Sequence, residues 1–227
     1  MIRLENISKS YKKKKGKQEI LVLNRISCTI KTGEMVAIMG RSGVGKTTFM
    51  NILSGLLKAD HGRYYFDEED ISEFDRRKRE SFRERNIGMV VQDYALLNSL
   101  SAEENILLPI KYRKYDKKFI EKKMEELSEI LGIEHCLNKK IYELSGGECQ
   151  RVAIARALIK EPSVILADEP TGSLDCLSEK EVLELLYELK KQRRTIIIAT
   201  HSKIVSEYCD RIFEIVDGKL QECYHMK

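Results

Sequence analysis

Residues 35–47 decide the fold, and they read Met35-Val-Ala-Ile-Met39 followed by Gly40-Arg-Ser-Gly-Val-Gly-Lys46-Thr47. The first part is a continuous apolar run, which is typical of a strand buried on both faces. The second part matches GxxxxGK[ST], in which glycines let backbone N–H groups surround a diphosphate. Apolar residues at helical spacing follow, beginning with Phe49. A glycine loop between a strand and a helix predicts a nucleoside triphosphate site rather than a chance turn.

The glycine loop has several means of holding a triphosphate. Lys46 supplies a point charge, and Thr47 supplies a hydroxyl that can ligate Mg²⁺. The helix that starts here adds the positive end of its dipole. ATP and Mg²⁺ are therefore the expected cofactors, and the expected binding residues are Gly40, Arg41, Ser42, Gly43, Val44, Gly45, Lys46, Thr47 and Thr48.

Outward from this loop, short apolar runs alternate with helical patterns. The runs are Ile87 to Val91, Ser163 to Ala167 and Thr195 to Ala199, and helical patterns at 116–131, 150–159 and 178–192 separate or flank them. This alternation predicts an α/β fold, a P-loop NTPase core with a mainly parallel sheet.

Two further regions differ from that core. Alternating apolar and polar residues at 1–11 and 19–30, joined by 63–67, predict an antiparallel β subdomain. Residues from about 93 to 147 have helical periodicity and no buried-strand pattern, which predicts an inserted helical subdomain. We expect one domain over residues 1–227 that contains this lobe.

Composition excludes some classes of protein. Lys and Arg total 40 against 36 Asp and Glu, so the net charge of +4 is too even to indicate nucleic-acid binding, and no nucleic acid is expected as a partner. No apolar run reaches the roughly 18 residues of a membrane span, and the N-terminus does not resemble a secretory leader. The six cysteines lack CxxC spacing and are expected to be free thiols.

Polar residues close three of the buried strands. Asp168 ends one strand and is expected to hold Mg²⁺, while the adjacent Glu169 polarises the water that attacks the γ-phosphate. His201 follows another strand and is expected to bond to the γ-phosphate. Gln92 ends the third and is expected to contact Mg²⁺ or the attacking water. The alternative for each is a solvated residue that merely closes a strand.

A second glycine pair opens another helix. Leu144-Ser145-Gly146-Gly147-Glu148 precedes a helical pattern from Arg151 to Leu158, so it is a helix N-terminus with exposed N–H groups. Because one loop already surrounds one triphosphate, this receptor implies a second ligand or half of a site shared with another copy of the chain. A plain capped helix remains a third interpretation.

These motifs, taken together, resemble the ATP-binding subunit of an ABC transporter from end to end. The motifs are GRSGVGKTT, Gln92, LSGGE with QRVAIARAL, VILADEP, Ser173-Leu174-Asp175 and His201. The resemblance implies an ATP-dependent homodimer that is arranged head to tail. Each ATP then lies between one Walker A loop and the partner's signature, which here is Ser145, Gly146, Gly147 and Glu148. It also implies that Asp175 lies at the site and that Tyr11 stacks on adenine.

The chain departs from the family pattern at two points. Thr47 replaces the commoner Ser and keeps the hydroxyl, while Cys149 replaces the Gln that usually follows LSGGE. Cys149 and Cys176 lie beside the signature and the D-loop, which raises the hypothesis of a redox switch.

Residues 92–97 and 104–110 are similar to the branch containing macrolide exporters, lipoprotein-releasing complexes and antimicrobial-peptide or bacteriocin transporters. The resemblance implies a separate transmembrane permease subunit, and hence a location at the cytoplasmic face of the cell membrane. It implies a docking groove beside the helical lobe, containing Tyr94, Leu96, Leu97, Leu100, Leu107 and Ile110.

The alternative function is signalling through a membrane partner without transport, as in cell-division complexes. A soluble ABC ATPase acting on DNA or ribosomes usually has two ATP domains or long insertions, which 227 residues do not accommodate. The sequence identifies neither the substrate nor the direction of transport.

Overall fold

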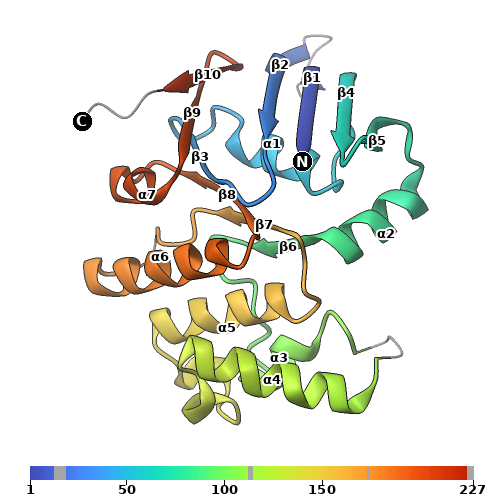
Figure 1. Ribbon diagram of the computed structural model, residues 1–227. Coiled ribbons are helices and arrows are strands. Elements are labelled where there is room, and N and C mark those ends of the chain that lie inside the picture. The colour runs from blue at the N-terminus through green and yellow to red at the C-terminus, as the bar shows by residue number, and fades with distance from the viewer. Residues whose placement is uncertain (13–18, 112–114, 173, 224–227) are drawn as a thin grey trace.

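The computed structural model describes residues 1–12, 19–111, 115–172 and 174–223, which form two β-sheets and a set of helices (Figure 1). The larger sheet has the strand order β10-β9-β3-β8-β7-β6. Its strands are β3 (Met35–Met39), β6 (Ile87–Val90), β7 (Val164–Asp168), β8 (Thr195–Thr200), β9 (Arg211–Val216) and β10 (Lys219–Cys223). All neighbours pair in parallel except β10, which pairs antiparallel with β9. The predicted parallel α/β core is confirmed.

The strand β3 lies inside this sheet between β8 and β9. Successive side chains of a strand point to opposite faces, and the two faces of β3 are both apolar and buried. Met35 and Ala37 pack in one core cluster, with α5 (Gly146–Leu158) and α6 (Cys176–Lys191). Val36 and Ile38 pack in the other, with α1 (Lys46–Leu53). The glycine loop therefore leaves a strand that is fixed on both faces.

The smaller sheet is antiparallel and has the order β2-β1-β4-β5. Its strands are β1 (Ile2–Lys12), β2 (Glu19–Ile30), β4 (His61–Phe66) and β5 (Glu69–Asp70). Its apolar face joins the α1 side of the core through residues such as Leu4 and Leu23. The short helix η1 (Ile71–Glu73) and α2 (Arg76–Asn86) follow it. The predicted antiparallel subdomain is confirmed.

The region predicted as a helical lobe contains α3 (Ala102–Leu107), α4 (Lys117–Leu131), η2 (Glu134–Cys136) and η3 (Ile141–Glu143). It lies at one end of the molecule in Figure 1. The next helix, α5, contacts α3 and α4 on one side and α6 and β6 on the other. The lobe and the core are therefore packed through a shared helix.

Helix ends differ from the sequence expectations by a few residues. α1 stops at Leu53 rather than Leu57, because Gly55 takes a left-handed conformation with φ +70°. α5 begins at Gly146 rather than Gln150, so the signature glycines are already helical. α6 begins at Cys176, two residues early, because the Asp175 side chain caps it.

The hairpin of β9 and β10 was missing from the sequence interpretation. The signal was present, since residues 211–216 are mostly β-branched or aromatic and Asp217-Gly218 is a strong two-residue turn. Both turn residues have positive φ. β9 extends the sheet beside β3, and α7 (Lys203–Tyr208) leads into it.

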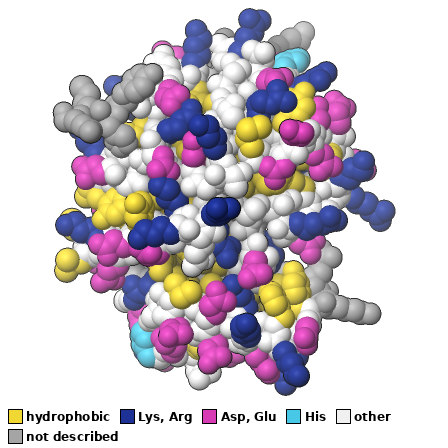
Figure 2. All heavy atoms as spheres, viewed as in Figure 1, with side chains coloured by type: hydrophobic (Ala, Val, Ile, Leu, Met, Phe, Trp, Pro, Cys, Tyr) yellow, Lys and Arg dark blue, Asp and Glu magenta, His cyan; other side chains and the backbone are white. Residues whose placement is uncertain are grey.

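The surface view in Figure 2 shows basic and acidic side chains interspersed over the visible face. In α2, Arg76 pairs with Glu80 across one helical turn. The six cysteines are free. Among the described residues, no helix is both long enough and apolar enough to cross a bilayer.

Candidate functional site

The glycine loop leaves the carboxyl end of β3 and turns sharply into α1. Gly40, Gly43 and Gly45 have φ values of +147°, +77° and +117°, which side-chain-bearing residues rarely adopt. At Gly40 there is also no room, since a Cβ atom would lie 2.8 Å from Val44 Cγ1 and 2.9 Å from the Ile215 carbonyl oxygen. Backbone shape therefore favours glycine at all three positions, and packing adds a second requirement at Gly40.

Lys46 is the first residue of α1, and its side chain is only 8% exposed. Its ammonium donates to the Gly40 carbonyl at 2.8 Å and lies 3.4 Å from Glu169 Oε1. The N-cap residue Gly45 has no side chain to cap the helix. The N–H groups of the first turn are therefore left for a ligand, beside a buried cation.

Thr47 and Asp168 bring two hard oxygen ligands together. The Thr47 hydroxyl donates to Asp168 Oδ2 at 2.9 Å, which joins α1 to the end of β7. Burial raises the pKa of Asp168, and the hydrogen bond from Thr47 opposes this shift. A hydroxyl and a carboxylate are the oxygen donors that Mg²⁺ prefers, so the residues fit this ion.

Glu169 follows in a left-handed conformation, with φ +48°. Its Oε1 lies 3.0 Å from Nδ1 of His201, and its Oε2 accepts a hydrogen bond from the Thr200 hydroxyl at 3.2 Å. The Glu169 side chain is 11% exposed, whereas that of His201 is 71% exposed. The ends of β7 and β8 thus join a buried carboxylate to an imidazole that reaches solvent.

A cavity of about 260 Å³ lies between the glycine loop and the two carboxylates at the end of β7. It is lined by Val22, Ser42, Gly43, Gly45, Lys46, Thr47, Thr48, Gln92, Asp168 and Glu169. The structure therefore brings together most of the residues predicted for phosphate, metal and water, although their roles remain predictions. Val22, on β2, was not foreseen; its place in an alternating strand was the only signal.

Three of the predicted loop residues do not line the cavity, namely Gly40, Arg41 and Val44. Tyr11 lies beside Thr48, which does line it. Arg41 accepts a bond from the Val44 N–H at 3.3 Å within the loop. The Tyr11 ring is 43% exposed, and its hydroxyl is 3.4 Å from Thr48 Oγ1. An exposed ring on β1 beside the loop is available to a base, which is consistent with the predicted stacking on adenine.

The signature lies at the N-terminus of α5. Ser145 caps the helix by accepting from the Glu148 N–H at 3.2 Å, and Glu148 Oε2 accepts from the Ser145 N–H at 2.7 Å. These bonds, together with one from His135, lower the pKa of Glu148 to about 2. Ser145 and Gly146 are exposed. The described lining of the nucleotide cavity includes no signature residue, and α5 packs on the opposite face of the sheet from α1.

Asp175 lies near the signature rather than near the cavity. It caps α6 by accepting from the Leu177 and Ser178 N–H groups and from the Ser178 hydroxyl. These bonds lower its pKa, the backbone bond from Ser178 most. A Cβ at Gly147 would lie 3.3 Å from Ser178 Oγ, so the starts of α5 and α6 are adjacent. Ser173, the first residue of the predicted D-loop, lies outside the described residues.

The segment after Gln92 is held by two residues that sequence reasoning missed. The Arg156 guanidinium donates to the carbonyls of Tyr94 and Ala95 at 2.6 and 2.5 Å. Both of these residues have positive φ. Asn105 is fully buried and bonds to both backbone groups of Leu97. The only sequence signal for the role of Asn105 was its position as a polar residue next to the apolar run that begins at Ile106.

The predicted docking residues divide between core and surface. Ile110 is buried, Tyr94, Leu96 and Leu107 pack partly against the core, and Leu97 is 50% exposed. A neighbouring cavity of about 400 Å³ lies between α2 and α5 and is lined by charged residues including Arg83, Arg156 and Lys160. The surface beside the lobe is therefore less apolar than the sequence suggests.

The two cysteines of the redox hypothesis differ in environment. Cys149 is buried, and burial raises the pKa of its thiol, which disfavours the reactive thiolate. Cys176 is exposed at the first position of α6. The structure thus gives no support to Cys149 as a reactive thiol.

Comparison with known proteins agrees with this geometry. A family model described as ABC transporter matches residues 23–172. The ABC transporter ATP-binding protein YxdL of Bacillus subtilis is 42% identical, over 97% of this chain and 85% of that protein. The bacitracin export ATP-binding protein BceA of Halalkalibacterium halodurans is 40% identical, over 97% and 87%. A dimeric post-hydrolysis structure of the ATP-binding cassette MJ0796, bound to ADP and Pi, matches with a TM-score of 0.90 and 36% identity over the whole of both chains.

Proposed function

The chain belongs to the ABC transporter family, and from that premise we propose that it hydrolyses ATP as one half of a head-to-tail dimer that drives a separate membrane subunit. The observation that carries this proposal is the arrangement at the carboxyl ends of β3 and β7. A buried lysine, a paired hydroxyl and carboxylate, and a second carboxylate line one cavity there. ATP hydrolysis is the general activity of this family.

Phosphoryl transfer needs positioning and charge stabilisation more than covalent chemistry. In our proposal, Lys46 exchanges its bonds to Gly40 and Glu169 for bonds to the phosphates. That exchange frees Glu169, whose backbone is anchored by a bond from its N–H to the Ala199 carbonyl at 2.8 Å. Glu169 then orients and deprotonates the attacking water, while His201 keeps the carboxylate in place or contacts the γ-phosphate.

Mg²⁺, when bound, neutralises phosphate charge and polarises the reacting phosphoryl group. Thr47 and Asp168 would hold it, since their oxygens already face one another. Gln92 lines the same cavity and completes the proposed ligand set. Because Gln92 begins the segment held by Arg156, its position links the nucleotide to the surface beside the helical lobe.

The dimer follows from the separation of the two phosphate-binding ends within one chain. α1 and α5 pack on opposite faces of the sheet, so the signature of one chain faces away from that chain's own nucleotide. We propose that a second copy supplies Ser145, Gly146 and Gly147 to close the site. The dimeric arrangement reported for MJ0796 supports this proposal.

For the membrane partner, we propose a separate permease that docks beside the lobe, near Leu97 and the cavity of Arg83 and Arg156. The chain would then work at the cytoplasmic face of the membrane. The bacitracin export protein BceA supports an antimicrobial peptide as the class of exported or extracted cargo. A drug or a lipoprotein is the alternative cargo for this branch.

The chemical step is tested by Glu169→Gln, which keeps the shape of the side chain and removes its charge. We expect ATP hydrolysis to fall by about 10²–10⁴-fold, with ATP still bound and the dimer more abundant on size-exclusion chromatography in Mg-ATP. Glu188→Gln is a matched control, because Glu188 is an exposed carboxylate paired with Lys191 on α6. Normal turnover by Glu169→Gln would remove Glu169 from the role of base.

The membrane partner is tested with the same variant, expressed with a tag in its native cell and purified in detergent with Mg-ATP. We expect a multi-span membrane protein to copurify and to be identified by mass spectrometry. Recovery with ribosomes or DNA, and without a membrane protein, would contradict the transporter proposal. It would leave the ATPase proposal standing, since that depends on the Glu169 experiment alone.

A further inference from the structure

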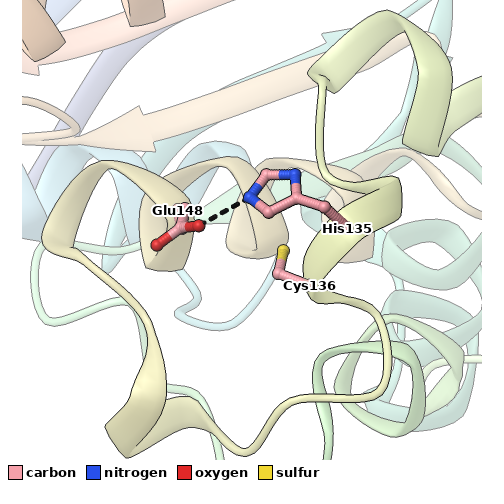
Figure 3. A group of neighbouring side chains, drawn as sticks. All are labelled: His135, Cys136 and Glu148. Atoms are coloured by element: carbon pink, nitrogen blue, oxygen red, sulfur yellow. Dashed lines mark hydrogen bonds and ion pairs between the residues drawn. The ribbon is translucent and has the colours of Figure 1, made fainter.

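A second group of potential metal ligands lies outside the nucleotide cavity. His135 and Cys136 belong to η2, and Glu148 lies in the first turn of α5 (Figure 3). The three ligand atoms lie within 4.8 Å of one another. The figure shows the imidazole and the carboxylate pointing toward each other, with the Cys136 sulfur beside them.

Two of the three ligands are already held in place. His135 Nε2 lies 2.8 Å from Glu148 Oε1, so a metal ion could bind both atoms when the neutral imidazole carries its one proton on Nδ1. The other oxygen of Glu148 accepts from the Ser145 N–H and stays bound to it. Glu148 therefore presents Oε1 toward His135, while its other oxygen keeps the helix cap.

The third ligand is a fully buried thiol. Cys136 Sγ donates to the Ile133 carbonyl at 3.2 Å, which fixes the sulfur within η2. Burial raises the pKa of this thiol, so the thiol is protonated without metal and must lose its proton to bind one. The His135 side chain is 57% exposed, which leaves an entry path for an ion and room for a water as fourth ligand.

The ligand set selects the type of ion. Nitrogen, sulfur and oxygen donors from His, Cys and Glu are typical of Zn²⁺, which binds them at about 2.0–2.3 Å in tetrahedral geometry. That geometry places ligand atoms roughly 3.3–3.8 Å apart, so a pair as far apart as 4.8 Å must approach by about 1–1.5 Å, while the imidazole nitrogen and the carboxylate oxygen must separate from 2.8 Å. Mg²⁺ prefers oxygen ligands and is not expected to compete here.

We propose that His135, Cys136 and Glu148 form a binding site for a thiol-binding divalent cation of the Zn²⁺ class. The bound ion joins η2 of the helical lobe to the start of α5, directly beside the signature glycines. It is distinct from the proposed Mg²⁺ position of Thr47 and Asp168, which lies across the sheet and contains no sulfur.

The test uses Co²⁺ as a spectroscopic probe on the full chain without nucleotide. We expect a single equivalent to bind with a near-ultraviolet sulfur-to-cobalt charge-transfer band, displaced by Zn²⁺, and with release of a proton into weak buffer. Bound Zn²⁺ is also expected to raise the unfolding temperature. Cobalt bound at Asp168 and Glu169 in the nucleotide cavity would give no sulfur band.

Two variants and two matched controls complete the test. Cys136→Ala should abolish the band, and Cys149→Ala, a change at the neighbouring buried cysteine, should keep it. His135→Gln alters an exposed side chain, so folding is preserved; it should weaken binding by more than the roughly 10–100-fold typical of a supporting residue. His61→Gln is its control. Absence of the band in the unaltered chain, its persistence in Cys136→Ala, or unchanged affinity in His135→Gln would overturn the proposal.

Discussion

The glycine loop after β3 and the signature at the start of α5 differ in how many of their polar groups are paired and buried within their own chain. At the end of β3, Lys46, Asp168 and Glu169 are each paired with a neighbour and mostly buried. At the start of α5, Ser145 and Glu148 cap one another, and Gly146 is exposed. The groups around the glycine loop are therefore assembled within one chain, whereas the signature is an exposed, capped helix start that can receive a ligand from outside the chain. We infer that the chain carries two half-sites rather than one whole site.

The sharpest test of this difference mixes two inactive variants. Lys46→Ala removes the cation from the first half-site, and Gly146→Asp puts a carboxylate in front of the second, where it repels phosphate. Each variant alone should lose ATP hydrolysis. An equal mixture should recover about a quarter of normal activity, because half of the dimers then contain one site built from two intact halves.

The measurement is the rate of phosphate release after the two variants are mixed and allowed to exchange. The control is the double variant carrying both changes in one chain, mixed with the unaltered chain, in which the mixed dimers have no intact site. Recovery absent from the first mixture would mean that each chain completes its own site, and the comparison would fail.

A second prediction separates backbone shape from packing within the first half-site. Gly43→Ala costs about 1–2 kcal/mol for a left-handed residue, and a Cβ there meets nothing within 4 Å. Gly40→Ala adds a collision with Val44 and with the Ile215 carbonyl. We expect Gly40→Ala to lower the unfolding temperature and the affinity for a fluorescent ATP analogue more than Gly43→Ala does. Equal losses would show that the contact with β9 is unimportant.

A third prediction concerns the segment that lies between the half-sites. Arg156→Ala removes two hydrogen bonds from a charged donor, each of which typically contributes about 1.5–3 kcal/mol to stability. Tyr94 and Ala95 then keep their positive φ values without the guanidinium that holds their carbonyl groups. Arg156→Lys keeps the charge but not the two-pronged geometry. In urea unfolding, we expect Arg156→Ala to lower the free energy of unfolding the most and Arg156→Lys to lower it by an intermediate amount. If Arg156→Lys is as stable as the unaltered chain, charge alone holds the segment.

The smallest expected effect is at the cap of the second half-site. The pKa of Glu148 falls from 4.5 to about 2 on folding. Its contribution to stability is therefore present above about pH 4.5 and is lost as the pH falls toward about 2. Glu148→Ala should cost about 1 kcal/mol at neutral pH, and its urea-unfolding curve should converge with that of the unaltered chain near pH 2. A pH-independent difference would mean that packing, rather than the charged cap, is responsible.

Sequence patterns predicted the first half-site well because its chemistry is local. A glycine loop between a strand and a helix, and carboxylates that end an apolar strand, are contiguous in the chain. The supports were harder to foresee. Arg156 reaches the carbonyls of Tyr94 and Ala95 from a distant helix, and Thr200 holds Glu169 from a neighbouring strand. Contacts of this kind depend on tertiary packing, which no local pattern encodes.

The fold shows the same division. The buried central strands were predictable from apolar runs. β9 and β10 were missed because charges such as Arg211 and Glu214 interrupt their apolar residues, which leaves no continuous apolar run. The cluster of His135 and Cys136 with Glu148 was also not apparent, since a 3₁₀ turn and a helix start bring the residues together only after folding.

The contact between Gly40 and Ile215 also has a consequence for biosynthesis. β3 is flanked by β8 and β9, both of which come from the last third of the chain. At about 5–20 residues per second, β3 leaves the ribosome on the order of ten seconds before either neighbour exists. Until then β3 has neither of the strands that pair with it, and the Ile215 backbone beside Gly40 is absent. We therefore expect a chain that terminates before β8 not to form the nucleotide pocket, because β3 and β7 would then lack the strand that joins them.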